Sequence, residues 1–266
     1  MKDESKCTDE ELKRQIYEKA RDLGAELVNC CSVEKWQEIP QQKPEFYPQN
    51  IWPWSEKVIV LGIPLFAPMI DTTPSIVYQE LYTTSNKLLD EMAYRLSSYI
   101  VTQLGYKAIF FPRDCYYGID DLVANPSAAF SHVLAAYYAG MGTIGDSHNL
   151  ITPEFGPRVR MVSIITDAPI AADPMIEKDL CIHCGQCLKH CPSNCFRDSG
   201  DPVYDMDKVA CTKHHVTLKN EHHWPCGICI DVCPVGKDLK MYAGQERITA
   251  DGTAHCRSFG SSPSKR

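Results

Sequence analysis

Residues 181–192 read Cys181-Ile-His-Cys184-Gly-Gln-Cys187-Leu-Lys-His-Cys191-Pro192. The stretch follows the spacing C-x2-C-x2-C-x3-C-P, in which three cysteines stand close together and a fourth precedes a proline. Because a tight loop turns successive thiolates inward, three such cysteines can surround one iron–sulfur cube. The proline ends the loop and removes a backbone donor. This stretch therefore predicts iron–sulfur ligation.

A second, shorter run follows at Cys226-Gly-Ile-Cys229-Ile-Asp-Val-Cys233-Pro234. It has one cysteine fewer, and Cys211 upstream can supply the missing ligand. In bacterial two-cluster ferredoxins the last cysteine of each run binds the cluster of the other run. We therefore expect two [4Fe–4S] clusters. Cluster one is expected to take Cys181, Cys184, Cys187 and Cys233, and cluster two Cys191, Cys211, Cys226 and Cys229.

Zinc or simple packing are the alternatives for these cysteines. Structural zinc sites usually use two separated C-x2-C pairs, which disfavours zinc here. Cys195 is a rival ligand, but it follows Pro192 so soon that we expect a packed or free thiol. Gly185 and Gly227 suit the close backbone approach of cluster loops. Cysteines elsewhere are expected to be free thiols: Cys7, Cys30, Cys31, Cys115 and Cys256. We expect the nearby histidines to lie at the surface or to support the cysteine ligands: His183, His190, His214, His215, His222 and His223.

The composition narrows the class of protein. The chain has 266 residues and 14 cysteines, and the cysteines concentrate in one segment, unlike those of a short secreted disulfide framework. The net charge of −7 argues against a broad basic surface for nucleic acid. No apolar run is long enough to span a membrane, and the polar start MKDESKCTDEELKR is unlike a signal peptide. We expect a cytoplasmic protein without membrane contact.

The first 170 residues alternate helical and strand patterns, which predicts an α+β fold of layered α/β type. Residues 36–56, rich in proline and tryptophan, predict a packed irregular segment. We expect an α/β domain at 1–172, a ferredoxin-like domain at 173–243 and a mobile tail at 244–266. Helices are expected at 8–23, 75–104 and 127–139, and strands at 57–64, 106–111 and 158–166.

The segment Gly140-Met-Gly142-Thr-Ile-Gly145 matches the string G-x-G-x-x-G. The dinucleotide-binding fingerprint needs a strand before this string and a helix after it. Here a predicted helix comes before it and an extended stretch follows, so we reject nucleotide binding. Two interpretations stay open, a glycine-rich turn that closes a helix and a backbone loop that touches a large flat cofactor.

Several motifs in chain order carry a resemblance to a known family. They are Ser131-His132, the glycine segment, Leu150-Ile-Thr-Pro-Glu-Phe-Gly156-Pro-Arg158-Val-Arg160, Thr166-Asp167-Ala-Pro169 and both cysteine runs. Over about residues 8–240 the chain resembles the epoxyqueuosine reductase-like proteins, cobalamin-dependent iron–sulfur oxidoreductases related to reductive dehalogenases. The resemblance implies a nitroreductase-like N-terminal domain and a corrinoid, such as cobalamin, between that domain and the cluster module. It implies these corrinoid contacts: Gly140, Gly142, Gly145, Asp146, Ser147, His148, Asn149, Leu150 and Gly156.

The chain departs from this family at the expected proton donor. The position where the family carries an acid falls near Asn125–Pro126, and neither residue is acidic. Neighbouring residues are the catalytic candidates that remain: Tyr116, Tyr117, Asp120 and Asp121. The chain also ends soon after the clusters, so we expect a short form without the helical-repeat extension that helps to bind tRNA. With the charge of −7, this argues against tRNA modification.

Three functions follow as hypotheses. The first is an oxidoreductase that passes electrons from two [4Fe–4S] clusters to a bound corrinoid and reduces a small substrate. The second is an electron-transfer protein that serves a corrinoid on a partner protein or holds one without turnover. The third is an epoxyqueuosine reductase. Expected partners are an electron donor such as a ferredoxin or flavodoxin, and a small-molecule substrate or a corrinoid protein. Nucleic acid is not an expected partner.

Overall fold

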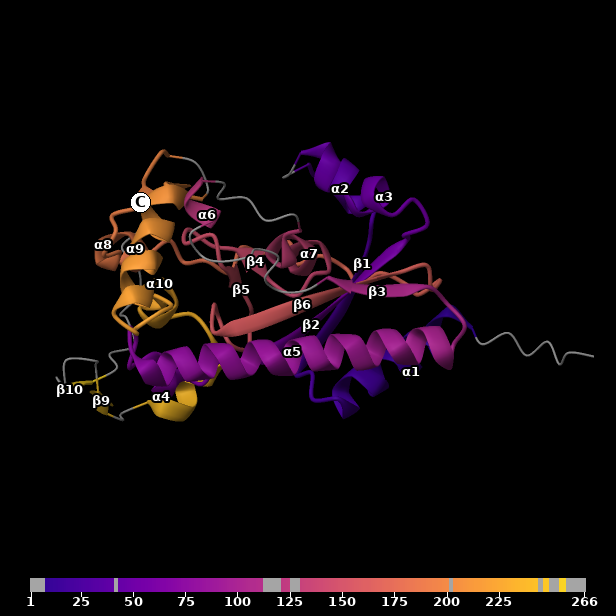
Figure 1. Cartoon of the computed structure of the whole chain (residues 1–266), viewed down its shortest axis with the longest axis horizontal. Helices are drawn as coiled ribbons and strands as arrows, with labels where there is room; N and C mark the ends of the chain where they lie inside the picture. The colour runs from indigo at the N-terminus through magenta and orange to yellow at the C-terminus, as the bar shows by residue number, and fades with distance from the viewer. Residues whose placement is uncertain are drawn as a thin grey trace, which may run out of the picture.

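The computed structural model describes residues 8–40, 43–111, 121–124, 130–200, 203–243, 246–248 and 254–256. Its centre is a four-stranded sheet in the order β1-β2-β6-β3 (Figure 1). The strands are β1 (Leu27–Ser32), β2 (Lys57–Pro64), β3 (Ala108–Phe111) and β6 (Val159–Thr166), and all three pairings are antiparallel. The long central pair β2–β6 runs from Lys57 opposite Thr166 to Pro64 opposite Val159. The fold is thus a mixture of helices and strands, as the alternating pattern predicted.

Helices cover both faces of this sheet because successive strand side chains point to opposite sides. In β2, Ile59 and Leu61 pack with helices α1 (Asp9–Asp22) and α5 (Ile76–Thr102). Val58 and Val60 point the other way, toward α7 (His132–Tyr138) and the buried Trp36. Figure 1 shows α1 and α5 on one side of the sheet and α7 on the other. The sheet is therefore the middle of three layers.

Side-chain caps set where the helices begin. Thr8 accepts a hydrogen bond from the Glu11 backbone N–H at 3.2 Å, and Ser75 accepts one from Tyr78 at 3.2 Å. These caps explain why the helices predicted at 8–23 and 75–104 are confirmed. The helix predicted at 127–139 was placed too early. It begins at His132 because Ser131 caps the Leu134 N–H, and residues 125–129 lie outside the described part of the chain.

The edge strand β1 was not predicted. It pairs with β2 from Leu27 opposite Gly62 to Ser32 opposite Lys57. Asn29 and two cysteines interrupt the usual alternation of apolar and polar residues, so the pattern was weak. Cys30 and Cys31 are 0% and 1% exposed and pack into the two opposite core layers. Both are free thiols, as expected.

The irregular segment before β2 consists of short helical turns. They are α2 (Lys35–Glu38), η1 (Pro44–Phe46) and α3 (Pro48–Ile51). Trp36 is fully buried, with its ring centroid 4.7 Å from that of Tyr138 and 6.0 Å from that of Phe130. The tryptophan thus anchors this segment on α7.

The cysteine-rich segment gathers at one end of the sheet, beside the start of α5 (Figure 1). It contains α8 (Gln186–His190), the antiparallel pair β7 (Phe196–Arg197) and β8 (Asp205–Met206), α9 (Lys208–Asn220), α10 (Ile228–Asp231) and η2 (Lys237–Tyr242). Helices α8 and α10 contact each other. The short helices α4 (Ala67–Ile70) and α6 (Asp121–Ala124) contact α10 and α9. Two N-terminal elements therefore touch this segment.

Asp173 fixes the start of the cysteine-rich segment to the sheet. Its carboxylate accepts hydrogen bonds from the Tyr17 hydroxyl, from Lys13 Nζ at 2.7 Å and from the Cys30 backbone N–H at 2.8 Å. These contacts join α1, β1 and the segment that leads to Cys181. In the predicted tail, β9 (Glu246–Ile248) pairs with β10 (Ala254–Cys256). Within the described ranges, the structure contains no helix with the length and apolar character needed to cross a bilayer.

Candidate iron–sulfur centre

A pocket at the sheet end brings both cysteine runs together. Three cysteines of the first run, Cys181, Cys184 and Cys187, line it together with Cys229 and Cys233 of the second run. The remaining wall comes from the hairpin of β4 (Thr143–Ile144) and β5 (Leu150–Ile151) and from the loop after Cys233. The four cysteines that the spacing assigned to cluster one therefore share a single pocket.

The other four cysteines form a second group next to the first. The thiol of Cys226 lies close enough to Cys211 and Cys191 for their charges to raise its pKa. The thiol of Cys229 is affected in the same way by Cys226 and Cys211. Cys211 lies in α9, Cys229 lies in α10, and Cys226 lies two residues before α10. Three segments far apart in the sequence thus converge on one group of sulfurs.

Hydrogen-bond donors point at most of these sulfurs. Backbone N–H groups approach them as follows: Asp146 and His183 on Cys181, Leu188 on Cys187, Ser193 and Cys195 on Cys191, Ile228 on Cys226, and Val235 on Cys233. The side-chain amide of Asn149 adds a donor to Cys229 at 3.5 Å. Donors of this kind favour the thiolate form, which is the form that binds iron. The donor set fits thiolate-bound iron–sulfur clusters.

Burial works against ionisation of the free thiols. It raises the pKa of Cys187 to about 12 and those of Cys226 and Cys233 to about 11. Burial likewise raises the pKa of Cys181, Cys211 and Cys229. At Cys191 burial is outweighed by hydrogen bonds from Ser193 and Cys195, and the pKa is lowered. Most of the free thiols are therefore protonated at neutral pH, and iron binding must release their protons.

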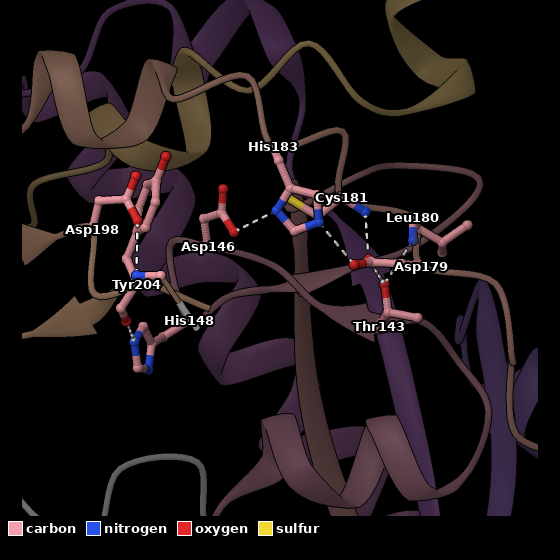
Figure 2. A network of polar contacts seen from close by, with 10 residues as sticks. Thr143, Asp146, His148, Asp179, Leu180, Cys181, His183, Asp198 and Tyr204 are labelled. Carbon is pink, nitrogen blue, oxygen red and sulfur yellow. Dashed lines mark hydrogen bonds and ion pairs between the residues drawn. The ribbon is translucent and has the colours of Figure 1, made fainter. Parts of the chain in front are cut away.

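His183 ties the first cysteine run to the β4–β5 hairpin (Figure 2). Its Nδ1 lies 2.8 Å from an oxygen of the buried Asp146, and its Nε2 lies 3.0 Å from an oxygen of Asp179. Burial alone would lower its pKa, but these hydrogen bonds outweigh burial and raise it. Asp179 also accepts the Cys181 N–H at 2.9 Å and the Thr143 hydroxyl at 3.3 Å. The network holds Cys181 against the hairpin loop.

Arg158 fixes the loop that follows Cys233. It stands one residue before β6, and its side chain is 1% exposed. The guanidinium donates two hydrogen bonds to Asp238, at 2.7 and 2.8 Å, and others to the backbone oxygens of Cys233 at 3.0 Å and Val235 at 2.5 Å. Such a planar fork suits a carboxylate and adjacent carbonyls at once. Arg158 thus sets the position of Cys233 relative to the sheet.

The glycines of the predicted corrinoid loop lie close to other parts of the chain. A Cβ atom at Gly140 would stand 1.9 Å from the Pro174 oxygen, and one at Gly142 would stand 2.2 Å from the Ile151 oxygen. At Gly156 it would stand 1.9 Å from the Val235 oxygen. These three glycines thus let backbone segments of the chain approach one another closely. Gly142 allows the pairing within the hairpin, and Gly140 and Gly156 allow contact with residues of the cysteine-rich segment.

Gly145 and Leu150, two other predicted corrinoid residues, are also engaged within the chain. A Cβ atom at Gly145 would stand 2.8 Å from Cγ1 of Ile151 and 3.5 Å from Sγ of Cys181. Leu150 is buried in the core layer that contains Trp36. The absence of a side chain at Gly145 therefore makes room for the side chain of Ile151 in the same hairpin.

Ser147 and His148, at the tip of the same hairpin, also bond to the chain itself. Ser147 is buried, and its hydroxyl accepts a hydrogen bond from Asn149 at 3.0 Å. His148 Nε2 lies 2.6 Å from the backbone oxygen of Tyr204. Hydrogen bonds within the loop and to Tyr204 therefore hold the tip of the hairpin in place.

The candidate proton donors are only partly described. Asp121 is exposed at the start of α6, which contacts α9. Tyr116, Tyr117 and Asp120 lie outside the described residues, as does Asn125–Pro126. His132 of the Ser131-His132 motif contacts Ser163 Oγ at 2.9 Å and the rings of Phe111 and Phe130.

Two supports of the site were not predicted from the sequence. One is the Arg158–Asp238 pair, which joins residues 80 positions apart. The other is the pairing of His183 with Asp146 across 37 positions. Neither pairing follows a local pattern. Arg158 stands in a motif that carries the family resemblance, whereas Asp146 directly follows the glycine segment.

Comparison with known proteins identifies an iron–sulfur motif and two kinds of relatives. Residues 174–197 match the Fer4 family, described as a 4Fe-4S binding domain. The tetrachloroethene reductive dehalogenase of Sulfurospirillum multivorans is 25% identical over 197 residues, which cover 68% of this chain and 36% of that protein. The epoxyqueuosine reductase of Listeria monocytogenes is 32% identical over 123 residues, covering 44% of this chain and 32% of that protein. The chain thus spans about a third of the length of these relatives.

Solved structures of both kinds share the fold. A reductive dehalogenase whose structure suggests a mechanism for B12-dependent dehalogenation matches 91% of this chain and 35% of its own, with a TM-score of 0.68 and 20% identity. An epoxyqueuosine reductase bound to a tRNA stem loop matches 85% and 65%, with a TM-score of 0.61 and 18% identity. The chain is therefore a relative of the reductive dehalogenases and the epoxyqueuosine reductases, and it carries a 4Fe-4S binding domain.

Proposed function

We propose that the chain is an oxidoreductase that holds two [4Fe–4S] clusters and passes their electrons to a bound corrinoid, which reduces a small substrate. The observation that carries this proposal is the gathering of eight cysteines in two adjoining groups, most of them facing hydrogen-bond donors. We assign cluster one to Cys181, Cys184, Cys187 and Cys233, and cluster two to Cys191, Cys211, Cys226 and Cys229.

Contact between the two groups supports electron transfer between them. Cys229 belongs to the second group but also lines the pocket of the first, and it lies within electrostatic range of Cys187. The hairpin loop touches both groups, since the Asp146 N–H reaches Cys181 and the Asn149 amide reaches Cys229. An external donor such as a ferredoxin or flavodoxin would supply the electrons.

The corrinoid is proposed from the relatives. One structural neighbour is described in terms of B12-dependent dehalogenation, and the sequence relatives include other reductive dehalogenases. A reduced corrinoid supplies a strongly nucleophilic cobalt centre for reductive chemistry. In this chain, we propose that the corrinoid binds beside the β4–β5 hairpin and its loop.

The second candidate is an electron-transfer protein without substrate turnover. The glycine packing favours it, because Gly140, Gly142 and Gly156 meet the chain's own backbone and so are explained without a macrocycle. Both candidates need the same clusters. The first also needs a bound corrinoid and substrate turnover, whereas the second can work without either.

Corrinoid binding is tested on the anaerobically reconstituted protein. We expect cob(II)alamin to bind with a shift in its absorption spectrum and to co-elute with the protein in size-exclusion chromatography. Serum albumin at the same concentration serves as the control for unspecific adsorption. Lack of binding by protein with full cluster content would contradict the first candidate and leave the electron-transfer function.

The same sample also tests the third hypothesis. Incubation with tRNA that contains epoxyqueuosine is expected to leave the nucleoside unchanged, because the position of the family's acid falls at Asn125–Pro126 and a general acid is needed for protonation. Efficient conversion to queuosine, seen by nucleoside analysis, would instead establish tRNA modification.

A further inference from the structure

A ninth cysteine, Cys195, lies inside the cysteine-rich segment and has no place in the two ligand sets. It is 1% exposed, and its Sγ lies 3.4 Å from Sγ of Cys191. The thiol of Cys211 lies close enough to influence its charge. Both neighbours belong to the ligand set that we assign to cluster two. The thiol of Cys195 thus lies beside two proposed ligand sulfurs and in hydrogen-bond contact with that of Cys191.

A tight turn fixes this thiol in place. The Asn194 N–H donates to the Cys191 oxygen at 3.2 Å, and Asn194 has a left-handed φ of 49°. On the other side, the Cys195 oxygen accepts the Asp207 N–H at 2.8 Å, and the buried Phe196 begins β7. Because backbone bonds hold it from both sides, the Cys195 side chain has little freedom to turn away from Cys191.

The short contact restricts what the two sulfurs can do. At 3.4 Å they stand in hydrogen-bond contact, so one acts as donor and the other as acceptor. Cys191 occupies the position before proline that supplies a ligand in the C-x2-C-x2-C-x3-C-P pattern. Cys191 also faces the hydroxyl of Ser193, whose Oγ lies 3.3 Å from its sulfur. Cys191 is therefore the acceptor, and Cys195 carries the hydrogen.

The second cysteine run lacks this feature. Cys195 follows Cys191 by four positions, and the residue four positions after Cys233 is Lys237. The Lys237 side chain is 68% exposed and lies 3.7 Å from Glu154. The pair of runs is therefore asymmetric, with a buried thiol donor beside only one of the two proline-preceding cysteines.

We propose that Cys195 is a positioning residue of cluster two, whose thiol donates a hydrogen bond to the ligand sulfur of Cys191 and raises the reduction potential of that cluster. The inference rests on the proposed two-cluster function. A hydrogen bond to a ligand sulfur stabilises the more negative, reduced cluster, and such bonds are among the factors that set cluster potentials. Cluster two is then easier to reduce than it would be without Cys195.

Redox titration of the reconstituted full chain, followed by electron paramagnetic resonance, tests this role. Cys195→Ala removes the donor, and Cys195→Val removes it while filling the space. Both variants are expected to keep the iron content of the wild type and to shift the cluster-two midpoint potential to more negative values, leaving cluster one unchanged. Cys195→Ser, which keeps a donor, is expected to restore the potential toward that of the wild type. Cys31→Ala, a buried thiol deleted from the sheet, controls for cavity effects.

The outcomes separate this inference from the proposed function. An unchanged midpoint potential of cluster two in Cys195→Ala and Cys195→Val would overturn the inference but leave the two-cluster proposal intact. Loss of half the iron in Cys195→Ala, with full iron in Cys191→Ala, would also overturn it, because Cys195 would then be the ligand. A wild-type protein with a single cluster would overturn the proposed function, and this inference with it.

Discussion

Replacing Arg158 by methionine is expected to lower the free energy of unfolding by about 3–5 kcal/mol, the usual cost of breaking a buried ion pair by removing one partner. The substitution leaves the carboxylate of Asp238, only 11% exposed, without its cation. It also removes the donors to the backbone oxygens of Cys233 and Val235. Because these contacts position Cys233, we further expect reduced iron content at cluster one.

Chemical denaturation of the apoprotein and iron analysis of the reconstituted protein measure the two effects separately. Arg95→Met is the matched control, since Arg95 pairs with Glu91 at the surface and is 59% exposed. A surface pair of this kind contributes about 0–1 kcal/mol. If Arg158→Met destabilised the protein no more than Arg95→Met does, Arg158 would have no anchoring role.

Replacing Cys233 by serine is the second change with a large expected effect. Cys233 stands in the second run, but it lines the pocket with Cys181, Cys184 and Cys187 and lies within electrostatic range of Cys181 and Cys184. We therefore expect the variant to lose or alter cluster one, while cluster two keeps its signal. The reason is that a serine oxygen is a poor substitute for a thiolate ligand of iron.

Electron paramagnetic resonance of the reduced variant distinguishes the two clusters. Cys226→Ser is the matched control in the same run, and it is expected to alter cluster two only. If Cys233→Ser disturbed the cluster of Cys226 and Cys229 and left the other intact, the proposed crossing of ligands between runs would be wrong.

Local patterns predicted most of the N-terminal fold. The strand predicted at 57–64 matches β2 residue for residue, and the long helix after Ser75 has a clear cap and periodicity. Strand β1 escaped prediction because Asn29, Cys30 and Cys31 give no alternating pattern, and pairing with β2 decides its conformation. The helix before Gly140 was predicted too early because apolar residues at 128–130 precede the cap at Ser131.

For the cysteine groups, too, local patterns predicted only part of the arrangement. The ligand sets follow from the spacing of the cysteines and from the crossing of ligands in two-cluster ferredoxins. The supports of these groups depend on contacts between distant segments, such as Arg158 with Asp238 and Asp146 with His183. The same limit applies to the glycines. A glycine at position 142 indicates that another part of the structure comes close there, but the sequence does not identify that part as the backbone of Ile151.

Iron and acid-labile sulfide analysis of the anaerobically reconstituted wild-type chain tests the central claim most directly. The account predicts about eight iron atoms and about eight sulfides per chain, since two cubes with four cysteine ligands each use the eight assigned thiols. A stable content near four iron atoms, or tightly bound zinc in place of iron, would contradict it.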